Sequence, residues 1–219
     1  MSATSTPLGS LFVVCAPSGT GKTSLVRALV SLLSNLKVSV SHTTRPQRPG
    51  ERDGRDYYFV DQTEFQRMLS TDALLEHALV FDHQYGTSRK WVEETLQHGD
   101  AILEIDWQGA RQIRKAFPGC VSIQVIPPSL ATLEERLRRR GQDAEATISR
   151  RMAEAVREMA DYAEFDYLII NDDFELALDR LQAVVLAERA RVRRMRREHQ
   201  ELLCHLLGPA LAAAKGDEA

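Results

Sequence analysis

The residues most able to do chemistry lie in one loop near the start of the chain, residues 16–23, with the sequence APSGTGKT. Gly19 and Gly21 allow the backbone to curl so that successive N–H groups point at phosphate oxygens. Lys22 supplies a mobile positive charge for the outer phosphates of a nucleotide, and the Thr23 hydroxyl is placed to bind Mg²⁺. The loop matches the phosphate-binding P-loop pattern at every defining position except the first, where Ala16 replaces glycine.

The elements around this loop support that interpretation. Residues 11–15 form an apolar run typical of a buried parallel strand, and the apolar residues of segment 22–33 recur with helical spacing. A strand, a glycine loop and a helix therefore follow one another, and a Gly/Ser turn that contains a lysine by coincidence is the weaker alternative. Because alanine tolerates positive φ poorly, Ala16 predicts an extended backbone at the first loop position.

Composition limits the class of protein. The chain has 219 residues, of which 43% are hydrophobic and 27% charged, and its net charge is −3. These values suit a single globular domain with insertions, and they do not point to nucleic acid or a membrane as partner. Cys15, Cys120 and Cys204 are odd in number and widely spaced, so we expect reduced thiols rather than disulfides or a zinc site. With neither a signal arrangement nor an apolar stretch of membrane-spanning length, a cytoplasmic protein is expected.

Apolar patterns along the rest of the chain predict strands that alternate with helices. Strands are expected at residues 37–41, 57–60, 101–105, 121–126 and 167–170, with a short apolar element at 74–81. Helices are expected at residues 62–69, 90–97, 108–116, 130–140 and 144–162, and from 174 to about 207. Residues 42–56, rich in Pro, Gly and Arg, are expected to form a loop outside the core, and residues 83–88 a second loop. This order predicts an α/β fold with a doubly wound parallel sheet and a site at the carboxyl ends of its strands.

A longer block, VSHTTRPQRPGERDGRDYYFV at residues 40–60, is far more specific than the P-loop. Together with EH at residue 76, YGT at 85, IDWQG at 105, RRRG at 138 and NDD at 171, it makes residues 9–189 strongly resemble the guanylate kinases. The resemblance implies a P-loop NTPase-type core, a small mixed α/β insert at about residues 41–88 that binds GMP, and a helical lid at about residues 130–155. Residues 190–219 would add a C-terminal helix and a flexible tail.

The resemblance also implies how GMP is bound. Arg45 and Arg48 would hold the 5′-phosphate together with two tyrosines, because guanidinium forks and phenol hydroxyls suit a dianionic phosphate. Glu76 would accept hydrogen bonds from N1–H and the 2-amino group of guanine, a donor pair that adenine lacks. Glu51 would order the two arginines, with a solvated loop acid as the alternative. The implied substrate-binding residues are Ser41, Arg45, Arg48, Glu51, Tyr57, Glu76, Tyr85, Gly86, Thr87, Glu104 and Asp106.

Asp106 ends a hydrophobic strand, which is the Walker B arrangement of an acid that orients Mg²⁺ or its water shell. A contact with the guanine pocket and a cap on the following helix are the alternatives. Glu104 lies two residues earlier on the same strand face, where many members of the family have Asp. Thr23 and Asp106 are thus the expected metal residues.

The resemblance places the catalytic cations in the P-loop, in the insert and in the lid. A mobile helix pair can bring arginines to the transferring phosphoryl group when the site closes. Asn171 matches a residue near the ATP adenine, with a cap on the following helix as the alternative. The implied catalytic residues are Lys22, Arg45, Arg136, Arg140 and Arg151. The implied ATP-binding residues are Ala16, Pro17, Ser18, Gly19, Thr20, Gly21, Lys22, Thr23 and Asn171.

The implied activity is phosphoryl transfer from ATP to GMP with Mg²⁺, in purine nucleotide recycling, through positioning and charge stabilisation. One rival is a guanylate-kinase-like module that binds phosphorylated peptides, against which the intact GTGKT argues. Another is a P-loop kinase for a different phosphate-bearing substrate, which would have no use for the guanine-reading residues. Segment 189–197, RARVRRMRR, is a third candidate as a nucleic-acid arm, but without interleaved aromatics a solvated helix face or a homo-oligomer contact is favoured.

Overall fold

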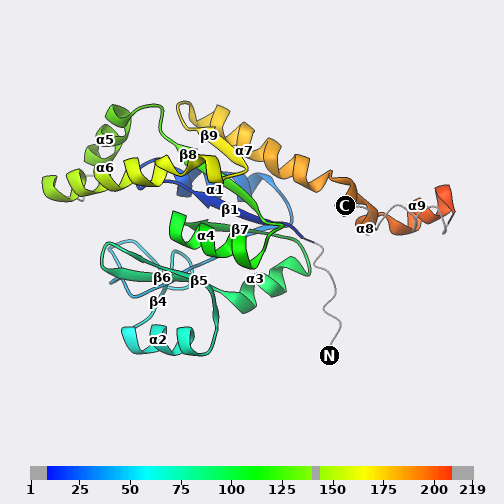
Figure 1. Cartoon of the computed structure of the whole chain (residues 1–219), viewed down its shortest axis with the longest axis horizontal. Helices are drawn as coiled ribbons and strands as arrows, with labels where there is room; N and C mark the ends of the chain where they lie inside the picture. Colours follow the sequence, from blue (N-terminus) through cyan, green and yellow to red (C-terminus); the bar gives the residue numbers. More distant parts are fainter. Residues whose placement is uncertain (1–8, 140–143, 209–219) are drawn as a thin grey trace.

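The computed structural model describes residues 9–139 and 144–208 (Figure 1). Within these residues the strands are β1 (Leu11–Cys15), β2 (Leu36–Val38), β3 (His42–Thr43), β4 (Tyr58–Phe59), β5 (Leu74–Val80), β6 (His83–Ser88), β7 (Asp100–Ile105), β8 (Val121–Ile126) and β9 (Tyr167–Ile170). The helices are α1 (Lys22–Leu32), α2 (Gln62–Ser70), α3 (Arg89–Leu96), α4 (Trp107–Ala116), α5 (Leu130–Arg139), α6 (Glu145–Ala160), α7 (Phe174–Arg189), α8 (Val192–Glu198) and α9 (Gln200–Leu207). A 3₁₀ turn spans Tyr162–Glu164.

The core is a parallel sheet of five strands in the order β2-β7-β1-β8-β9. Its central strand β1 is buried along its whole length, and its side chains alternate between two hydrophobic clusters. Phe12 and Val14 pack with residues of α1 and α7, whereas Leu11 and Val13 pack with residues of α3 and α4. A parallel strand covered by helices on both faces must be apolar throughout, which is why its sequence shows no alternation. The predicted doubly wound parallel sheet is confirmed.

A second sheet, in the order β4-β3-β6-β5, lies below the core in the view of Figure 1. The prediction of a loop at residues 83–88 is wrong, because this segment is β6 and pairs with both β3 and β5. Its sequence HQYGTS has no apolar run, so only the pairing on both sides identifies it as a strand. The strand predicted at residues 37–41 is also too long, because β2 ends at Val38 and the chain then leaves the core sheet for β3.

The loop predicted outside the core is partly buried. Thr43 is fully buried, and Arg45 is 7% exposed although it carries a charge. The burial of Arg45 is possible because its guanidinium donates to the Glu51 carboxylate, 2.7 Å away, and to the Pro46 carbonyl oxygen at 2.8 Å. A buried charge that is paired and hydrogen-bonded avoids most of the cost of leaving water.

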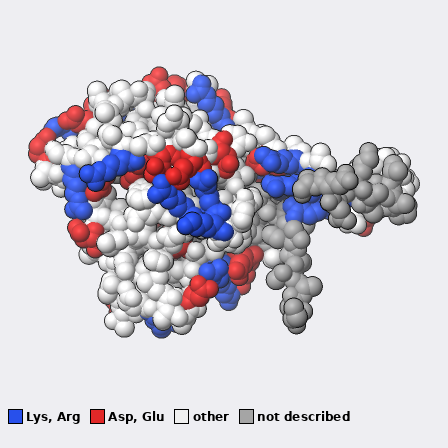
Figure 2. Space-filling view, in the orientation of Figure 1, with Lys and Arg blue, Asp and Glu red and all other residues white. Residues whose placement is uncertain are grey.

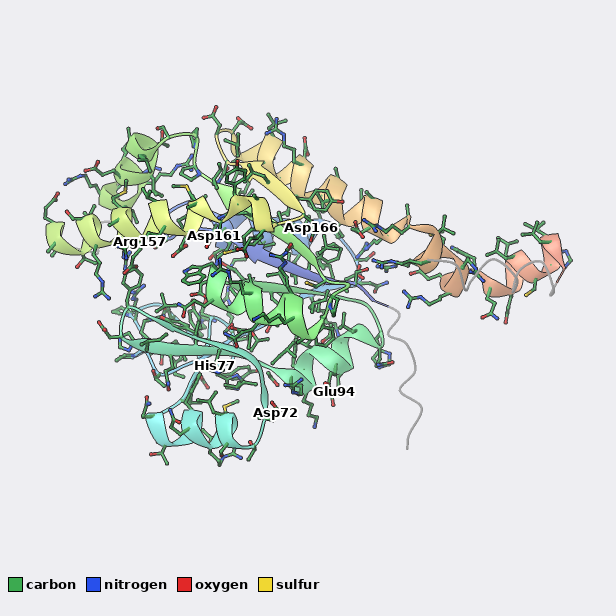
Figure 3. The ribbon with its side chains drawn as sticks, viewed as in Figure 1. Asp72, His77, Glu94, Arg157, Asp161 and Asp166 are labelled. Atoms are coloured by element: carbon green, nitrogen blue, oxygen red, sulfur yellow. The ribbon has the colours of Figure 1, made fainter. Side chains whose placement is uncertain are left out.

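Side chains of α4 join the second sheet to the core. At His77, labelled in Figure 3, the side-chain amide of Gln112 donates to the backbone oxygen at 2.6 Å and accepts from the backbone N–H at 3.1 Å. Gln112 therefore extends the edge of β5 as another strand residue would. Arg111, from the same helix, forms an ion pair with Asp161 at the end of α6 at 3.1 Å. Helix α4 thus holds both the second sheet and the segment that follows α6.

Helices α5 and α6 form a separate small cluster around Leu133, Leu137, Ile148 and Ala155. Helix α6 is tied to the core sheet where the Gln124 side chain donates to the Glu158 carbonyl oxygen at 2.7 Å. The helix spans Glu145–Ala160, within the predicted range of residues 144–162. Arg140, predicted to be a lid residue, lies outside the described residues.

The helical pattern predicted from residue 174 to about 207 is confirmed but is divided, because α7 ends at Arg189, α8 at Glu198 and α9 at Leu207. In Figure 1 this segment leaves the body as an arm, and basic side chains gather at its root in Figure 2. The fully buried carboxylate of Asp100, at the start of β7, accepts from Arg189 at 2.8 Å, Arg194 at 2.5 Å and the backbone N–H of Ser10 at 2.7 Å. Two arginines of the predicted basic segment thus fasten the arm to the sheet. In the described part of the chain, no helix is both long and apolar enough to cross a membrane.

Candidate active site

The P-loop connects the carboxyl end of β1 to the start of α1, and its two glycines are sterically required. Gly19 and Gly21 have φ values of 96° and 99°. A Cβ on Gly19 would lie 2.9 Å from a methyl carbon of Leu137, and one on Gly21 would lie 2.6 Å from the side-chain nitrogen of Asn171. Ala16 is not among the described residues with positive φ, as its identity predicts. Lys22, the first residue of α1, donates from Nζ to the Ile105 carbonyl oxygen at 2.9 Å.

The P-loop is supported through the carbonyl oxygen of Thr20, which is bound by a residue of α5 and by a residue that follows β9. The Thr20 carbonyl oxygen accepts from the Asn171 side chain at 2.6 Å and from Arg136 of α5 at 3.4 Å. Arg136 also donates to the carbonyl oxygen of Asn171 at 3.1 Å. The alternative that Asn171 caps the following helix is wrong, because Asp173 caps α7 by accepting from the Leu176 N–H. Asn171 and Arg136 therefore shape the P-loop itself.

The two acids at the end of β7 take different partners. Glu104 accepts a hydrogen bond from the Thr23 hydroxyl, the expected metal ligand of the P-loop. Asp106 is the N-cap of α4, where it accepts from the Gly109 N–H at 2.9 Å and from the Gln108 side chain at 3.0 Å. The helix-cap interpretation of Asp106 is confirmed. Burial raises the pKa of the Asp106 carboxyl above its ordinary value even though these hydrogen bonds favour the ionised form.

The second sheet and its loop carry a cluster of cations and phenols that faces the P-loop across a cleft. The Arg45 guanidinium lies 5.2 Å from the ring centre of Tyr57, and the rings of Tyr57 and Tyr85 meet edge to face at 5.8 Å. Glu51 binds Arg45 through one carboxylate oxygen and accepts from the Arg48 N–H at 2.9 Å through the other. Burial opposes the charge of Glu51, but these hydrogen bonds outweigh it and lower its pKa. The cluster is thus held in shape by Glu51.

Glu76 lies at the bottom of this side of the cleft and is 3% exposed. Its carboxylate accepts from the Thr87 hydroxyl at 2.6 Å. A Cβ on Gly109 would lie 2.3 Å from a Glu76 oxygen, so only glycine at position 109 leaves room for this carboxylate. Burial raises the pKa of Glu76 to about 7, while the hydrogen bond from Thr87 opposes the rise. A carboxylate buried at such a position is available to bind a donor-rich ligand.

The raised pKa of Glu76 predicts a pH-dependent stability. Between pH 4.5 and about 7 the unfolded chain loses this proton while the folded chain keeps it, so folding stability falls as pH rises through this window. We expect Glu76→Gln, which cannot ionise, to gain several degrees in Tm relative to wild type at pH 8 and far less at pH 5. Calorimetry without ligands at both pH values measures this difference. The exposed Glu93→Gln is the control, and a Glu76→Gln difference that is equal at both pH values contradicts the assignment.

The P-loop and the second sheet line one continuous cleft with a volume of about 340 Å³. The predicted residues that line it are Ala16, Pro17, Ser18, Gly19, Gly21, Lys22, Thr23, Ser41, Arg45, Arg48, Glu51, Tyr57, Glu76, Tyr85, Glu104, Asp106 and Arg151. Thr20, Gly86, Thr87 and Asn171 are buried next to the lining residues, and Arg136 is partly buried where it contacts the P-loop. The structure therefore brings most of the predicted residues to one cleft, from segments up to 135 residues apart, since Ala16 and Arg151 both line it.

The lining also includes residues that the sequence analysis did not predict: Ser24, Ala78, Val80, Phe81, Ile105 and Glu158. Glu158 of α6 is seven residues after Arg151, a spacing that places both on one helix face and could have identified it. Burial raises the pKa of Glu158 to about 7, and the positive charge of Lys22 opposes the rise. Phe81 lies in the turn between β5 and β6, and its sequence context gives no comparable signal.

Comparisons with known proteins give a consistent result. A family model described as guanylate kinase matches residues 9–188. The chain is 57% identical over 201 residues to a guanylate kinase of Methylococcus capsulatus, covering 91% of this chain and 98% of the relative. It is 53% identical over 202 residues to the guanylate kinase of Escherichia coli K12, with the same coverage. Among solved structures, the guanylate kinase of Anaplasma phagocytophilum matches with a TM-score of 0.76 and 32% identity, covering 92% of this chain and 97% of the other.

Proposed function

This chain belongs to the guanylate kinase family, and from that premise we propose how its side chains share the transfer of a phosphoryl group from ATP to GMP. The protein is an ATP:GMP phosphotransferase. One observation supports the division of roles: a single cleft joins the P-loop to a cluster of arginines and tyrosines. Two anion-binding surfaces that face each other suit an in-line transfer between two phosphates.

The donor side is the P-loop. We assign the α- and β-phosphates of ATP to the backbone N–H groups of the loop and the outer phosphates to Lys22, whose Nζ meanwhile binds the Ile105 carbonyl oxygen. Asn171 and Arg136 support the loop through Thr20, so their loss would disturb the donor site even without a direct contact with ATP. The adenine contact inferred for Asn171 stays a prediction.

The residues at the end of β7 suit Mg²⁺. Thr23 and Glu104 offer hydroxyl and carboxylate oxygens within hydrogen-bonding distance of each other, and Asp106 lines the same cleft. Mg²⁺ prefers such oxygen ligands and is commonly held by one or two protein groups together with phosphates. A bound Mg²⁺ would neutralise part of the negative charge of the ATP phosphates. Because both Asp106 oxygens already accept hydrogen bonds from α4, we assign Asp106 to the water shell rather than to the ion itself.

The acceptor side is the cluster in the second sheet. Arg45, Arg48, Tyr57 and Tyr85 would hold the GMP phosphate, with Glu51 fixing the arginines. Burial raises the pKa of Tyr57 to about 12, so its hydroxyl stays a neutral donor at physiological pH. Glu76 and Thr87 would read guanine together with Ser41, and Gly86 allows β5 and β6 to approach there, since a Cβ would lie 2.7 Å from Leu74.

The helical lid would complete the charge stabilisation. Arg151 of α6 lines the cleft, and Arg136 of α5 contacts the P-loop. Guanidinium groups stabilise the charge that develops on a transferring phosphoryl group. We propose these two arginines, with Arg140, as the lid cations. We further propose that the protein works with free thiols in the cytoplasm, in purine nucleotide metabolism; its three cysteines are free in the structure.

A coupled assay of ADP formation tests the proposal. With ATP and Mg²⁺, we expect turnover with GMP and far less with AMP, CMP or UMP, and loss of turnover when the metal is chelated with EDTA. Excess Mg²⁺ should restore the activity. Comparable rates with all four nucleotides would exclude the assigned guanine site, and GMP-dependent turnover that survives chelation would exclude the metal.

A further inference from the structure

The turn that joins β5 to β6 has an unusual backbone for its residues. Val80 pairs with His83, so Phe81 and Asp82 alone form a two-residue hairpin turn. Their φ values are 46° and 68°. Turns of this kind favour Asn-Gly or Asp-Gly, because positive φ at both positions brings a bulky side chain close to its own backbone. A phenylalanine at such a position is costly, and a conformation of this kind is retained where surrounding contacts hold it.

The contacts of this turn come from the lid. The guanidinium groups of Arg150 and Arg151 lie 5.3 Å and 5.4 Å from the ring centre of Phe81. Arg150 also forms an ion pair with Asp82 at 3.5 Å. Consecutive residues of α6, Arg150 and Arg151, thus both reach the tip of the second sheet. Cations over an aromatic face are attracted by its negative potential.

The two halves of the active site meet at this contact. Phe81 and Arg151 line the same cleft, and they do so from the second sheet and from the lid respectively. On its other side the lid packs against the P-loop, because a Cβ on Gly19 would meet Leu137 and Leu133 of α5 at 2.9 Å and 3.1 Å. The lid therefore bridges the donor side and the acceptor side of the cleft. The ion pair of Asp82 is largely exposed, since the Asp82 side chain is 82% exposed, and it contributes little beside the ring contact.

We propose that Phe81 is a positioning residue for Arg151: its ring, presented by the strained turn, holds the lid arginine in the cleft against the acceptor side. The inference rests on the proposed role of Arg151 in phosphoryl transfer. It assigns Phe81 no contact with the reacting atoms. The strained turn places the Phe81 ring against α6. The ring can hold Arg151 in the cleft only while α6 lies next to the turn.

Three substitutions at Phe81 distinguish the effect of the aromatic ring from the effect of the strained backbone. Phe81→Leu keeps the apolar bulk and removes the aromatic face, whereas Phe81→Tyr keeps the face. Phe81→Gly removes the side chain and suits the φ of 46°, so it provides a second variant if Phe81→Leu folds poorly. Leu79→Ala is the matched control, because Leu79 is on the same hairpin and 61% exposed. Thermal denaturation of each variant checks that it is folded.

Turnover with ATP and GMP is the first measurement. We expect Phe81→Leu and Phe81→Gly to lower kcat about tenfold with the KM for GMP changed less than about twofold, and Phe81→Tyr and Leu79→Ala to behave as wild type. In an Arg151→Ala background, Phe81→Leu should lower kcat no further. A raised KM with unchanged kcat would make Phe81 a wall of the GMP pocket and overturn the proposal, as would an undiminished effect without Arg151.

Amide hydrogen exchange of the nucleotide-free protein is the second measurement, and it does not depend on activity. Phe81→Leu should speed exchange in α6, Glu145–Ala160, by about 3- to 10-fold relative to wild type and Leu79→Ala. Unchanged exchange would show that the ring does not hold the lid and would overturn the proposal. If Arg151→Ala alone leaves kcat unchanged, the positioning role fails with the role of Arg151, whereas the exchange result still reports on the contact itself.

Discussion

Lys22→Ala is expected to lower kcat by about 10³-fold or more while changing the dissociation constant of GMP by less than about threefold. Lys22 is the first residue of α1 and lies in the part of the cleft formed by the P-loop. The residues assigned to GMP lie in the second sheet and its loop, where Glu51 binds Arg45 and the Arg48 N–H, and Glu76 binds Thr87. Loss of the lysine should therefore affect the transferring group and leave the acceptor site intact.

Steady-state kinetics gives kcat, and titration calorimetry with GMP alone gives its affinity. Lys22→Arg is the matched variant, because it keeps the charge but replaces a compact ammonium by a planar fork. It should recover only part of the activity. Lys37→Ala, which removes an exposed lysine, should behave as wild type. Wild-type-like turnover of Lys22→Ala would remove Lys22 from the phosphate site, and a large loss of GMP affinity would mean that the two sites are not separable.

Glu76→Gln is expected to reduce the preference for GMP over AMP by about 10²-fold or more. The carboxylate is buried and is hydrogen-bonded to Thr87, so a ligand that cannot donate to it leaves a buried acceptor unpaired. Glutamine has nearly the same shape, but an NH₂ donor replaces one of the two acceptor oxygens. It can therefore accept from only one of the two N–H groups of guanine, and its NH₂ faces the other. The effect should fall on kcat/KM for GMP and hardly on that for AMP.

The measurement is the ratio of kcat/KM for GMP to kcat/KM for AMP, with wild type alongside. Tyr85→Phe is the matched control, because its hydroxyl is assigned to the phosphate that both nucleotides share. It should lower both rates and leave their ratio unchanged. If Glu76→Gln leaves the ratio unchanged, Glu76 is not part of the base pocket. Glu76→Gln should also be more stable than wild type at pH 8. Loss of selectivity together with loss of stability would therefore indicate that this variant is misfolded.

The core could be predicted from local sequence because its signals are local. The strands β8 and β9 have the predicted bounds, since each is a run rich in apolar residues. β8 is largely buried, whereas β9 lies at the edge of the sheet with Leu168 and Ile170 exposed. The P-loop was found because glycine and lysine at fixed spacing are required by backbone curvature and phosphate charge. Glu76 was assigned only through the family resemblance. The residues that follow it, His77 and Ala78, do not indicate that its side chain is buried.

Features that depend on pairing between distant segments could not be predicted. β6 has no apolar run and is a strand because β3 and β5 flank it. Arg45 is buried because Glu51 binds it, and the arginine-rich C-terminal segment is structural because Asp100 lies fully buried 89 residues before Arg189. The breaks between α7, α8 and α9 occur without proline or glycine, so local propensity gives no warning. For β6, Arg45 and the C-terminal arginines, the missing information was which distant segment lies beside them.

The position of Asp100 affects how the protein can be immobilised or fused through its C-terminal end. Asp100 begins β7 and Asp106 follows its end, so the fastening point of the C-terminal arm and the nucleotide cleft are separated by the length of the strand, about 20 Å. A sensor chip, a bead or a fused reporter joined to the C-terminus would therefore pull on the far end of the sheet. Substrates could still enter, and a mechanical load on such a tether would first strain the ion pairs of Arg189 and Arg194.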